Sequence, residues 1–290
     1  MLKDTKATKI ALLVLVVILG LSFSLFRGCD ITSRGSKADQ SVAFTSSDSL
    51  KVSTITNNII IKIDPNSTQA RVSIGKSDND TLSVTKSSSQ LSVEVKPKKR
   101  LFFNIFSYKP SNLVITLPTS ELNNLDVSSV SGSIQLLQPI TAQQIRINST
   151  SGKVDVLDVQ AKKDIRLSTI SGSIRSNTAK SSGNLEVLST SGSLKVEKVS
   201  AARSILRTVS GSIDSIVFLP QQGSLEAKST SGSVKLDLRN ASDLSLNAST
   251  VSGRITFNGQ EQEKKPSLSL GASNQSVNLS SVSGSIAVTH

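Results

Sequence analysis

Ser-Val-Ser-Gly-Ser-Ile at residues 129–134 is the first clear copy of a phrase that returns along the rest of the chain. Each copy has Ser or Thr, a β-branched residue, Ser-Gly, a small or basic residue, and then Ile, Leu or Val. The glycines of the eight copies are Gly132, Gly152, Gly172, Gly192, Gly211, Gly232, Gly253 and Gly284. A nearly constant step of this length is typical of repeat proteins, in which each repeat is one structural unit.

Apolar residues keep fixed distances from these glycines: seven, five and two positions before, and two and four positions after. Around the first glycine they are Leu125, Val127, Val130, Ile134 and Leu136. Alternation with a period of two predicts two short β-strands per repeat, each with one buried face. We expect the glycine to form the corner between them with a positive φ, which glycine adopts without steric cost.

One repeat has too few inward residues to form a core, so neighbouring repeats must stack and bury one continuous apolar column. We therefore predict an all-β fold, a single-stack parallel β-solenoid with rungs of about 20 residues. The Ser before each glycine and the Ser or Thr two places earlier are expected to form hydroxyl ladders along the corners. Rungs with Ser176, Ser204, Ala227 or Ala248 at inward positions should have thinner cores.

Residues 50–63 form a degenerate further copy, with Asn57 in place of the glycine. Asparagine tolerates left-handed backbone geometry better than most residues, so it suits the predicted corner. The β-solenoid domain is therefore expected to span residues 42–290. Within it, residues 42–120 would form N-terminal rungs and a cap, and residues 121–290 the regular Ser-Gly repeats.

Residues 10–26 form an apolar or small stretch that follows Lys3, Lys6 and Lys9. Its length is near the lower limit for a membrane-spanning helix. The favoured interpretation is a retained signal anchor within residues 1–29, with residues 30–41 as a linker. Cleavage after Ser24 and lipidation of Cys29 are the alternatives. A retained anchor predicts a single-pass protein of the cell membrane with most of the chain extracytoplasmic.

The chain carries 33 basic and 21 acidic residues, a net charge of +12. Such a charge favours anionic partners, here anionic lipid or a wall polymer. The repeats lack the interleaved aromatic residues of single-strand binding surfaces, so nucleic acid is not an expected partner. Cys29 is the one cysteine, which excludes an intrachain disulfide.

Residues 96–110 break the pattern with Lys-Pro-Lys-Lys-Arg-Leu-Phe-Phe-Asn-Ile-Phe-Ser-Tyr-Lys-Pro. One interpretation is a cap that packs its rings over the N-terminal end of the stack. The sharper one is a contact with a membrane or a membrane partner, with rings at the acyl boundary and cations on anionic headgroups. The residues expected at this contact are Lys98, Lys99, Arg100, Phe102, Phe103, Phe106 and Tyr108.

The last copy of the phrase lies close to His290. If its rung ends the stack, its open strands invite strand addition, so we expect self-association or partner docking at the C-terminal rung. Residues 260–266, which are polar and charged, are interpreted as a solvated loop.

No catalytic, metal-binding or cofactor-binding residue is predicted, and the chain is not expected to be an enzyme. His290 is the one histidine, which excludes His-based catalytic triads. Some polysaccharide-cleaving β-helix enzymes cluster acidic groups on one face. Here Asp126, Asp155, Asp214 and Asp237 occur at different distances from their glycines, so no acidic ladder is expected.

The offsets, the Val-Ile-Thr-Leu-Pro at 114–118 and the Ser-Gly-x-Ile phrase resemble the "putative adhesin" family of bacterial envelope proteins. That family includes LiaG-like membrane-anchored proteins. The resemblance covers residues 42–290 and implies a β-solenoid, an envelope location and a link to cell-envelope stress, with no established activity.

Three functions follow from these observations. The first is a non-enzymatic, membrane-anchored, extracytoplasmic envelope scaffold or binding module. The second is a surface adhesin that binds host or matrix ligands, and the third is a polysaccharide-active enzyme.

Overall fold

The computed structural model describes residues 39–75, 80–97, 111–239, 241, 243–263, 265–272 and 274–290. All of them belong to one compact unit, Ser33–His290. They form strands and turns, with no helix in this part of the chain. Accordingly, none of the residues described here forms a helix long and apolar enough to cross a membrane. The stretch 10–26, for which an anchor was predicted, lies outside the described residues.

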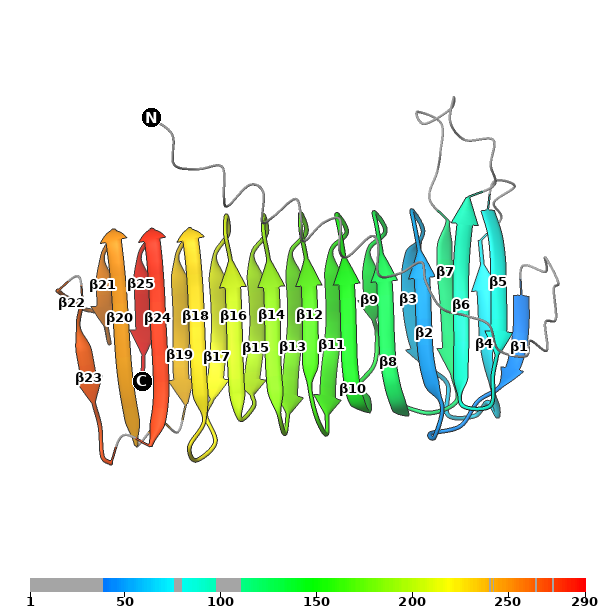
Figure 1. Cartoon of the computed structure of the whole chain (residues 1–290), viewed down its shortest axis with the longest axis horizontal. Helices are drawn as coiled ribbons and strands as arrows, with labels where there is room; N and C mark the ends of the chain where they lie inside the picture. Colours follow the sequence, from blue (N-terminus) through cyan, green and yellow to red (C-terminus); the bar gives the residue numbers. More distant parts are fainter. Residues whose placement is uncertain are drawn as a thin grey trace, which may run out of the picture. The chain divides into compact units, whose positions relative to one another are not determined.

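Each regular repeat folds into a rung of two strands that meet at a Ser-Gly corner (Figure 1). The rungs pair in parallel, and Ile147 lies opposite Val127 on one side and Leu167 on the other. The prediction of an all-β fold with stacked parallel repeats is confirmed. The successive rungs are β8 (Glu121–Ser129) with β9 (Ile134–Leu136), β10 (Ile140–Ser149) with β11 (Val154–Ala161), β12 (Ile165–Thr169) with β13 (Ile174–Ser181), β14 (Asn184–Ser189) with β15 (Leu194–Ser200), β16 (Arg203–Thr208) with β17 (Ile213–Phe218), and β18 (Ser224–Ser231) with β19 (Val234–Arg239).

At the N-terminal end, the first rung in the sequence is the second rung in space. Strands β2 (Ser49–Thr54) and β3 (Asn58–Ile63) lie between the β8–β9 rung and an outer rung of β6 (Gln90–Pro97) and β7 (Asn112–Leu117). Three antiparallel strands cover this outer rung: β5 (Asp80–Lys86) on β6, β4 (Gln69–Ile74) on β7, and β1 (Asp39–Ala43) on β4. A covered edge protects the stack against pairing with other chains.

The C-terminal end has the same exchange of order. Strands β24 (Gln275–Ser283) and β25 (Ile286–Thr289) lie inside the stack, between the β18–β19 rung and the rung of β20 (Leu244–Ser252) and β21 (Ile255–Phe257). The prediction of an open C-terminal rung at Gly284 is therefore wrong, because both edges of that rung are paired.

Two short antiparallel strands cover the outer rung at this end. Strand β22 (Gln260–Gln262) pairs with β21, and β23 (Ser267–Ser269) pairs with β20. Residues 260–266 are therefore not simply a solvated loop, since they begin with a capping strand. Short edge strands of polar residues are a common protection against strand addition.

The core is a column of inward side chains that continues through all rungs. The predicted inward positions seven and five before each glycine and two and four after it are buried, as for Leu125 and Ile134, except that Phe257 in the outer rung is only partly buried. The position two before the glycine is not. Val130 is 39% exposed and Val251 69% exposed, because the residue before each of them points inward and alternation turns these side chains out.

A further set of buried positions, seven and nine residues after the glycine, escaped the sequence analysis. Val159 and Ala161 occupy them in β11, and Ala179 and Ser181 in β13. The alternation changes phase between the two sets, where residues 157 and 158 are both partly exposed. The strand therefore bends there and adds another inward-facing side to the rung.

The small residues that were predicted at inward positions do face the core. Ser176, Ser204, Ala227 and Ala248 are all buried. The hydroxyl of Ser176 donates to the carbonyl of Thr178 at 3.0 Å. The hydroxyl of Ser204 is buried and has no hydrogen-bond partner within the described part of the chain.

Candidate functional site

The Ser-Gly corners form a line in which each glycine lies against the carbonyl oxygen of the neighbouring corner. A Cβ added to Gly152 would lie 2.0 Å from the oxygen of Gly132, and one on Gly172 would lie 2.1 Å from the oxygen of Gly152. None of the eight repeat glycines has a positive φ. The predicted left-handed corner is therefore wrong, and the close approach of the next backbone is what requires glycine.

Asn57 has an ordinary φ as well, so left-handed geometry does not explain it either. Its carbonyl oxygen lies 1.9 Å from the position of a Cβ on Gly132, so its backbone continues the corner line. On its other side β6 and β7 are joined by residues 98–111 in place of a Ser-Gly corner. Its side chain donates to Asp80 Oδ2 and to Oγ of Ser111, the residue before β7, both at 2.8 Å.

The hydroxyl ladder runs through the residue three before each glycine. The amide of Gly152 donates to Ser149 Oγ at 2.8 Å, and Ser189 Oγ donates to the carbonyl of Gly172 in the preceding rung at 3.1 Å. The other predicted row, the Ser directly before each glycine, points to solvent. Among the described residues, no hydrogen bond to another group is made by the side chain of Ser151 or its equivalents. The ladder hydroxyls thus hold the corners together.

All seven residues of the predicted membrane or partner contact, Lys98, Lys99, Arg100, Phe102, Phe103, Phe106 and Tyr108, lie outside the described residues. The strands that flank them are described. Strand β6 ends at Pro97 and β7 begins at Asn112, and together they form the outermost parallel rung. The described ends of β6 and β7 therefore lie where the other rungs have their corners. The buried side chains of Asn57 and Asp80 join Ser111 there.

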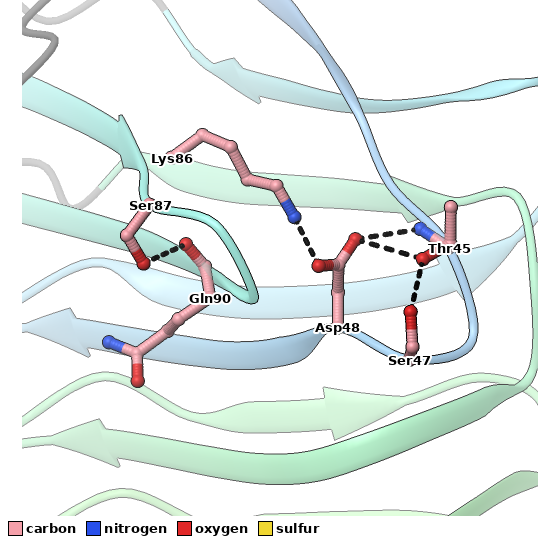
Figure 2. A network of polar contacts seen from close by, with 6 residues as sticks. All are labelled: Thr45, Ser47, Asp48, Lys86, Ser87 and Gln90. Carbon is pink, nitrogen blue, oxygen red and sulfur yellow. Dashed lines mark hydrogen bonds and ion pairs between the residues drawn. The ribbon is translucent and has the colours of Figure 1, made fainter.

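An ion pair between the buried Asp48 and the partly buried Lys86 fixes the β1–β2 turn to the end of β5 (Figure 2). Lys86 Nζ lies 2.5 Å from Asp48 Oδ1 and 5.4 Å from the centre of the Phe44 ring. The amide of Thr45 donates to Asp48 Oδ2 at 2.8 Å. Burial alone would raise the pKa of Asp48, but the hydrogen bonds from Lys86 and Thr45 outweigh it and lower the pKa below its usual value.

Replacing Asp48 with asparagine should reduce the free energy of unfolding by about 2 kcal/mol at pH 7, because the buried Nζ of Lys86 would lose its counter-ion. The folded-state pKa of Asp48 is lowered, so its contribution is complete above about pH 4 and is lost as pH falls through the folded-state pKa. Chemical denaturation from pH 7 to pH 3 measures both effects, and the variant should lose part of the acid dependence.

Asp155→Asn is the matched control, since its partner Lys153 lies 2.7 Å away at the surface. We expect it to cost less than about 0.5 kcal/mol, as exposed pairs do. Equal losses in the two variants would show that the Asp48 pair is no more than a surface contact.

An open cavity of about 420 Å³ lies beside the same turn. Its walls combine hydroxyl and amide groups with one carboxylate and one ammonium group. The lining residues are Ser46, Ser47, Glu121, Leu122, Asn123, Thr141, Ala142, Gln143 and Lys162. This set can form hydrogen bonds to a polar ligand, but it brings no pair of carboxylates together for acid–base chemistry.

The four acidic residues considered above are spread over different rungs. Asp126 lies on β8 between Lys51 and Arg146, and burial raises its pKa despite these cations. Asp155 and Asp237 are each bound to a basic residue two positions away. In the part of the chain described here, no three His, Cys, Asp or Glu side chains gather in a way that could hold a metal ion.

Several solved structures match this chain over most of its length at low sequence identity. A putative adhesin from Bacteroides fragilis is 12% identical, with 86% of this chain and 95% of that chain covered and a TM-score of 0.45. A putative lipid binding protein from Parabacteroides distasonis is 16% identical, with coverages of 88% and 98% and a TM-score of 0.43.

A putative cell adhesion protein from Clostridium sporogenes is 12% identical, with 87% of this chain and 97% of that chain covered and a TM-score of 0.30. No curated protein matches the chain. A family model matches residues 46–289, which include every rung of the stack and most of its caps. This chain therefore belongs to the Toastrack DUF4097 family.

Proposed function

We propose that the protein is a non-enzymatic binding module of the bacterial cell envelope, anchored through residues 10–26 with its stack outside the membrane. In this proposal the connection between β6 and β7 contacts the membrane or a membrane-bound partner. The family resemblance adds a link to cell-envelope stress as the setting in which such a module works.

One observation carries the proposal: the glycines and ladder hydroxyls of the repeats hold the corners of the stack together, and one rung has no such corner. Every Ser-Gly corner is closed by the glycine line and the ladder hydroxyls. The β6–β7 rung has instead a basic sequence rich in phenylalanine, and this rung is the outermost parallel one. We therefore place the function in the connection between β6 and β7, where the sequence departs from the repeat.

The chemistry of residues 98–109 suits a lipid interface. Aromatic rings insert at the acyl boundary, and flanking cations attract anionic headgroups by about 1 kcal/mol each. The buried Asn57, Asp80 and Ser111 cluster fixes the base of the connection to the stack. A contact there would hold the end of the stack against a bilayer.

Vesicle flotation of residues 39–290 tests this contact without the predicted anchor; these residues hold a continuous core of their own. With vesicles that contain anionic lipid, Phe102→Ser, Phe103→Ser and Phe106→Ser together should reduce binding at least about tenfold. Three rings that insert into the bilayer in this proposal would be lost.

The matched control is Val130→Ser, Val209→Ser and Val282→Ser, which changes three exposed apolar residues at the corners. This control should float like the unmodified protein. Unchanged flotation of the phenylalanine variant would overturn the proposed contact.

A further inference from the structure

The positive charge of the stack is concentrated in two adjacent rungs. Residues 162–203 contain eight basic and three acidic residues, a net charge of +5, whereas residues 121–161 contain two basic and four acidic residues, a net charge of −2. This stretch runs from the turn before β12 to the first residue of β16. The change of sign between neighbouring rungs indicates a localised surface rather than an evenly basic protein.

Seven of these basic residues are exposed and take part in no ion pair within the described residues. We call them the basic belt: Lys162, Lys163, Arg175, Lys180, Lys195, Lys198 and Arg203. The eighth, Arg166, is paired with Glu186. Of the remaining acids, Asp164 accepts hydrogen bonds from the amide and side chain of Asn184, and within the described residues neither Asp164 nor Glu197 forms an ion pair with a member of the belt.

Members of the belt lie next to one another across the rungs. Arg175 in β13 is directly opposite Lys195 in β15. The carbonyl of Lys163 accepts from the amide of Gly183, whose own carbonyl accepts from Arg203, so these residues lie on neighbouring turns. Like charges directly opposite each other destabilise a sheet. Asp155 lies opposite Arg175 on its other side and Asp214 lies opposite Lys195, but neither acid forms an ion pair with these cations in the described structure. A bound anion would therefore offset the repulsion between Arg175 and Lys195.

The belt also turns around the rung. In β13 the alternation changes phase at residues 177 and 178, so the strand bends between Arg175 and Lys180. Lys162 and Lys163 lie at the turn between β11 and β12. The cations therefore face several directions, and one flat surface cannot meet all of them at once.

We propose that the basic belt binds a flexible, linear, phosphate-bearing polymer that crosses these two rungs. The proposal rests on the proposed function as an envelope binding module and names its soluble ligand. A flexible polyanion can follow the bend, whereas a planar bilayer can reach one side only. None of the exposed large apolar residues lies between 162 and 203, so the belt has no group to insert into lipid. It also has no aromatic residue on which nucleic-acid bases could stack.

Binding of long-chain inorganic polyphosphate to the full chain in an uncharged detergent tests the belt. The variant Arg175→Gln, Lys195→Gln, Lys198→Gln should lose roughly 30-fold in affinity at ~50 mM salt, because three phosphate contacts disappear. The matched control is Lys62→Gln, Lys228→Gln, Lys235→Gln. These three residues are exposed and have no ion pair in the described structure. Their substitution changes the net charge by the same amount as the belt variant does. The control should lose less than about threefold.

Equal losses in the two variants would overturn the belt, because they would mean that net charge alone attracts the polymer. So would absence of polyphosphate binding, or tighter binding of single-stranded DNA or of vesicles with anionic lipid to this surface. The phenylalanine variant of residues 102, 103 and 106 should keep its polyphosphate affinity. A negative result in the polyphosphate experiment would not contradict the membrane contact tested by flotation. A negative result in flotation would not contradict polymer binding by the basic belt.

Discussion

Gly172→Ala is expected to lower the free energy of unfolding by about 3 kcal/mol or more. The added methyl group would overlap backbone atoms, which cannot move aside as the end of a flexible side chain can. The added Cβ would lie 2.1 Å from the carbonyl oxygen of Gly152 and 2.9 Å from the hydroxyl of Thr169. Both contacts belong to the corner line, so the rung would have to move away from its neighbour. The strand hydrogen bonds on both sides of the corner would then lengthen.

Gly75→Ala is the matched control. A Cβ there meets its first neighbour, Ser111 Cβ, at 3.6 Å, an ordinary contact, and Gly75 has no positive φ. We expect a change of less than about 1 kcal/mol, and a small gain is the favoured direction since alanine restricts the unfolded chain. Denaturant titration of both variants measures the difference. Similar stabilities would show that the corners can open to admit a methyl group.

Removal of residues 271–290 should shorten the stack by one rung and leave the outer rung folded. Strands β24 and β25 would be lost, and the edge of β18 would become free. Leu246 and Ala248 of β20 keep the inward offsets of Leu225 and Ala227 in β18. Strand β20 therefore has the right pattern to pair directly with β18.

A disulfide between Lys228→Cys and Ser249→Cys, with Cys29 replaced by serine, reports this pairing. In the intact protein both positions lie opposite Ser280, on either side of β24, so they are two strand spacings apart, about 9.6 Å. A disulfide needs a Cα separation of about 4.4–6.8 Å, which adjacent strands provide. We expect the bond in the shortened chain and not in the intact one.

Lys228→Cys with Ser280→Cys is the control for the intact chain, where these positions are paired and should cross-link. If the shortened chain forms no bond and its residues 244–257 become sensitive to protease, then β20 and β21 depend on β24 and β25 for their structure.

The repeat, the parallel stacking and most inward positions could be predicted, because period-two alternation and a constant spacing are local features of the sequence. The side-chain directions of Ser129 and Val130 could not be predicted in this way. Both are small or β-branched and suit a strand, but at the corner only Ser129 turns inward. The direction of a side chain at a tight corner depends on the neighbouring rung, which no single repeat contains.

The spatial order of the rungs could not be predicted for a related reason. Val277, Leu246 and Leu225 occupy the same position relative to their glycines. Any of the three strands fits beside any other, so the pattern alone gives no order. The order became visible only in the structure, where the carbonyl oxygen of Gly284 lies against Gly253 and that of Gly232 against Gly284.

The Asp48–Lys86 pair escaped the sequence analysis as well. The two residues are 38 positions apart and belong to the irregular N-terminal region, where no repeat aligns them. Thr45 and Asp48 do have the spacing of a side chain that binds a nearby amide in a turn. That signal predicts a turn but no buried counter-ion.

The line of glycine corners has a consequence for the size of the molecule. Each interior rung presents to the next one the same backbone surface that it receives from the one before. A whole repeat can therefore be gained or lost between the two covered ends without altering either end. Each repeat gained or lost changes the length of the stack by about 4.8 Å. The number of repeats therefore sets how far one end of the stack stands from the other.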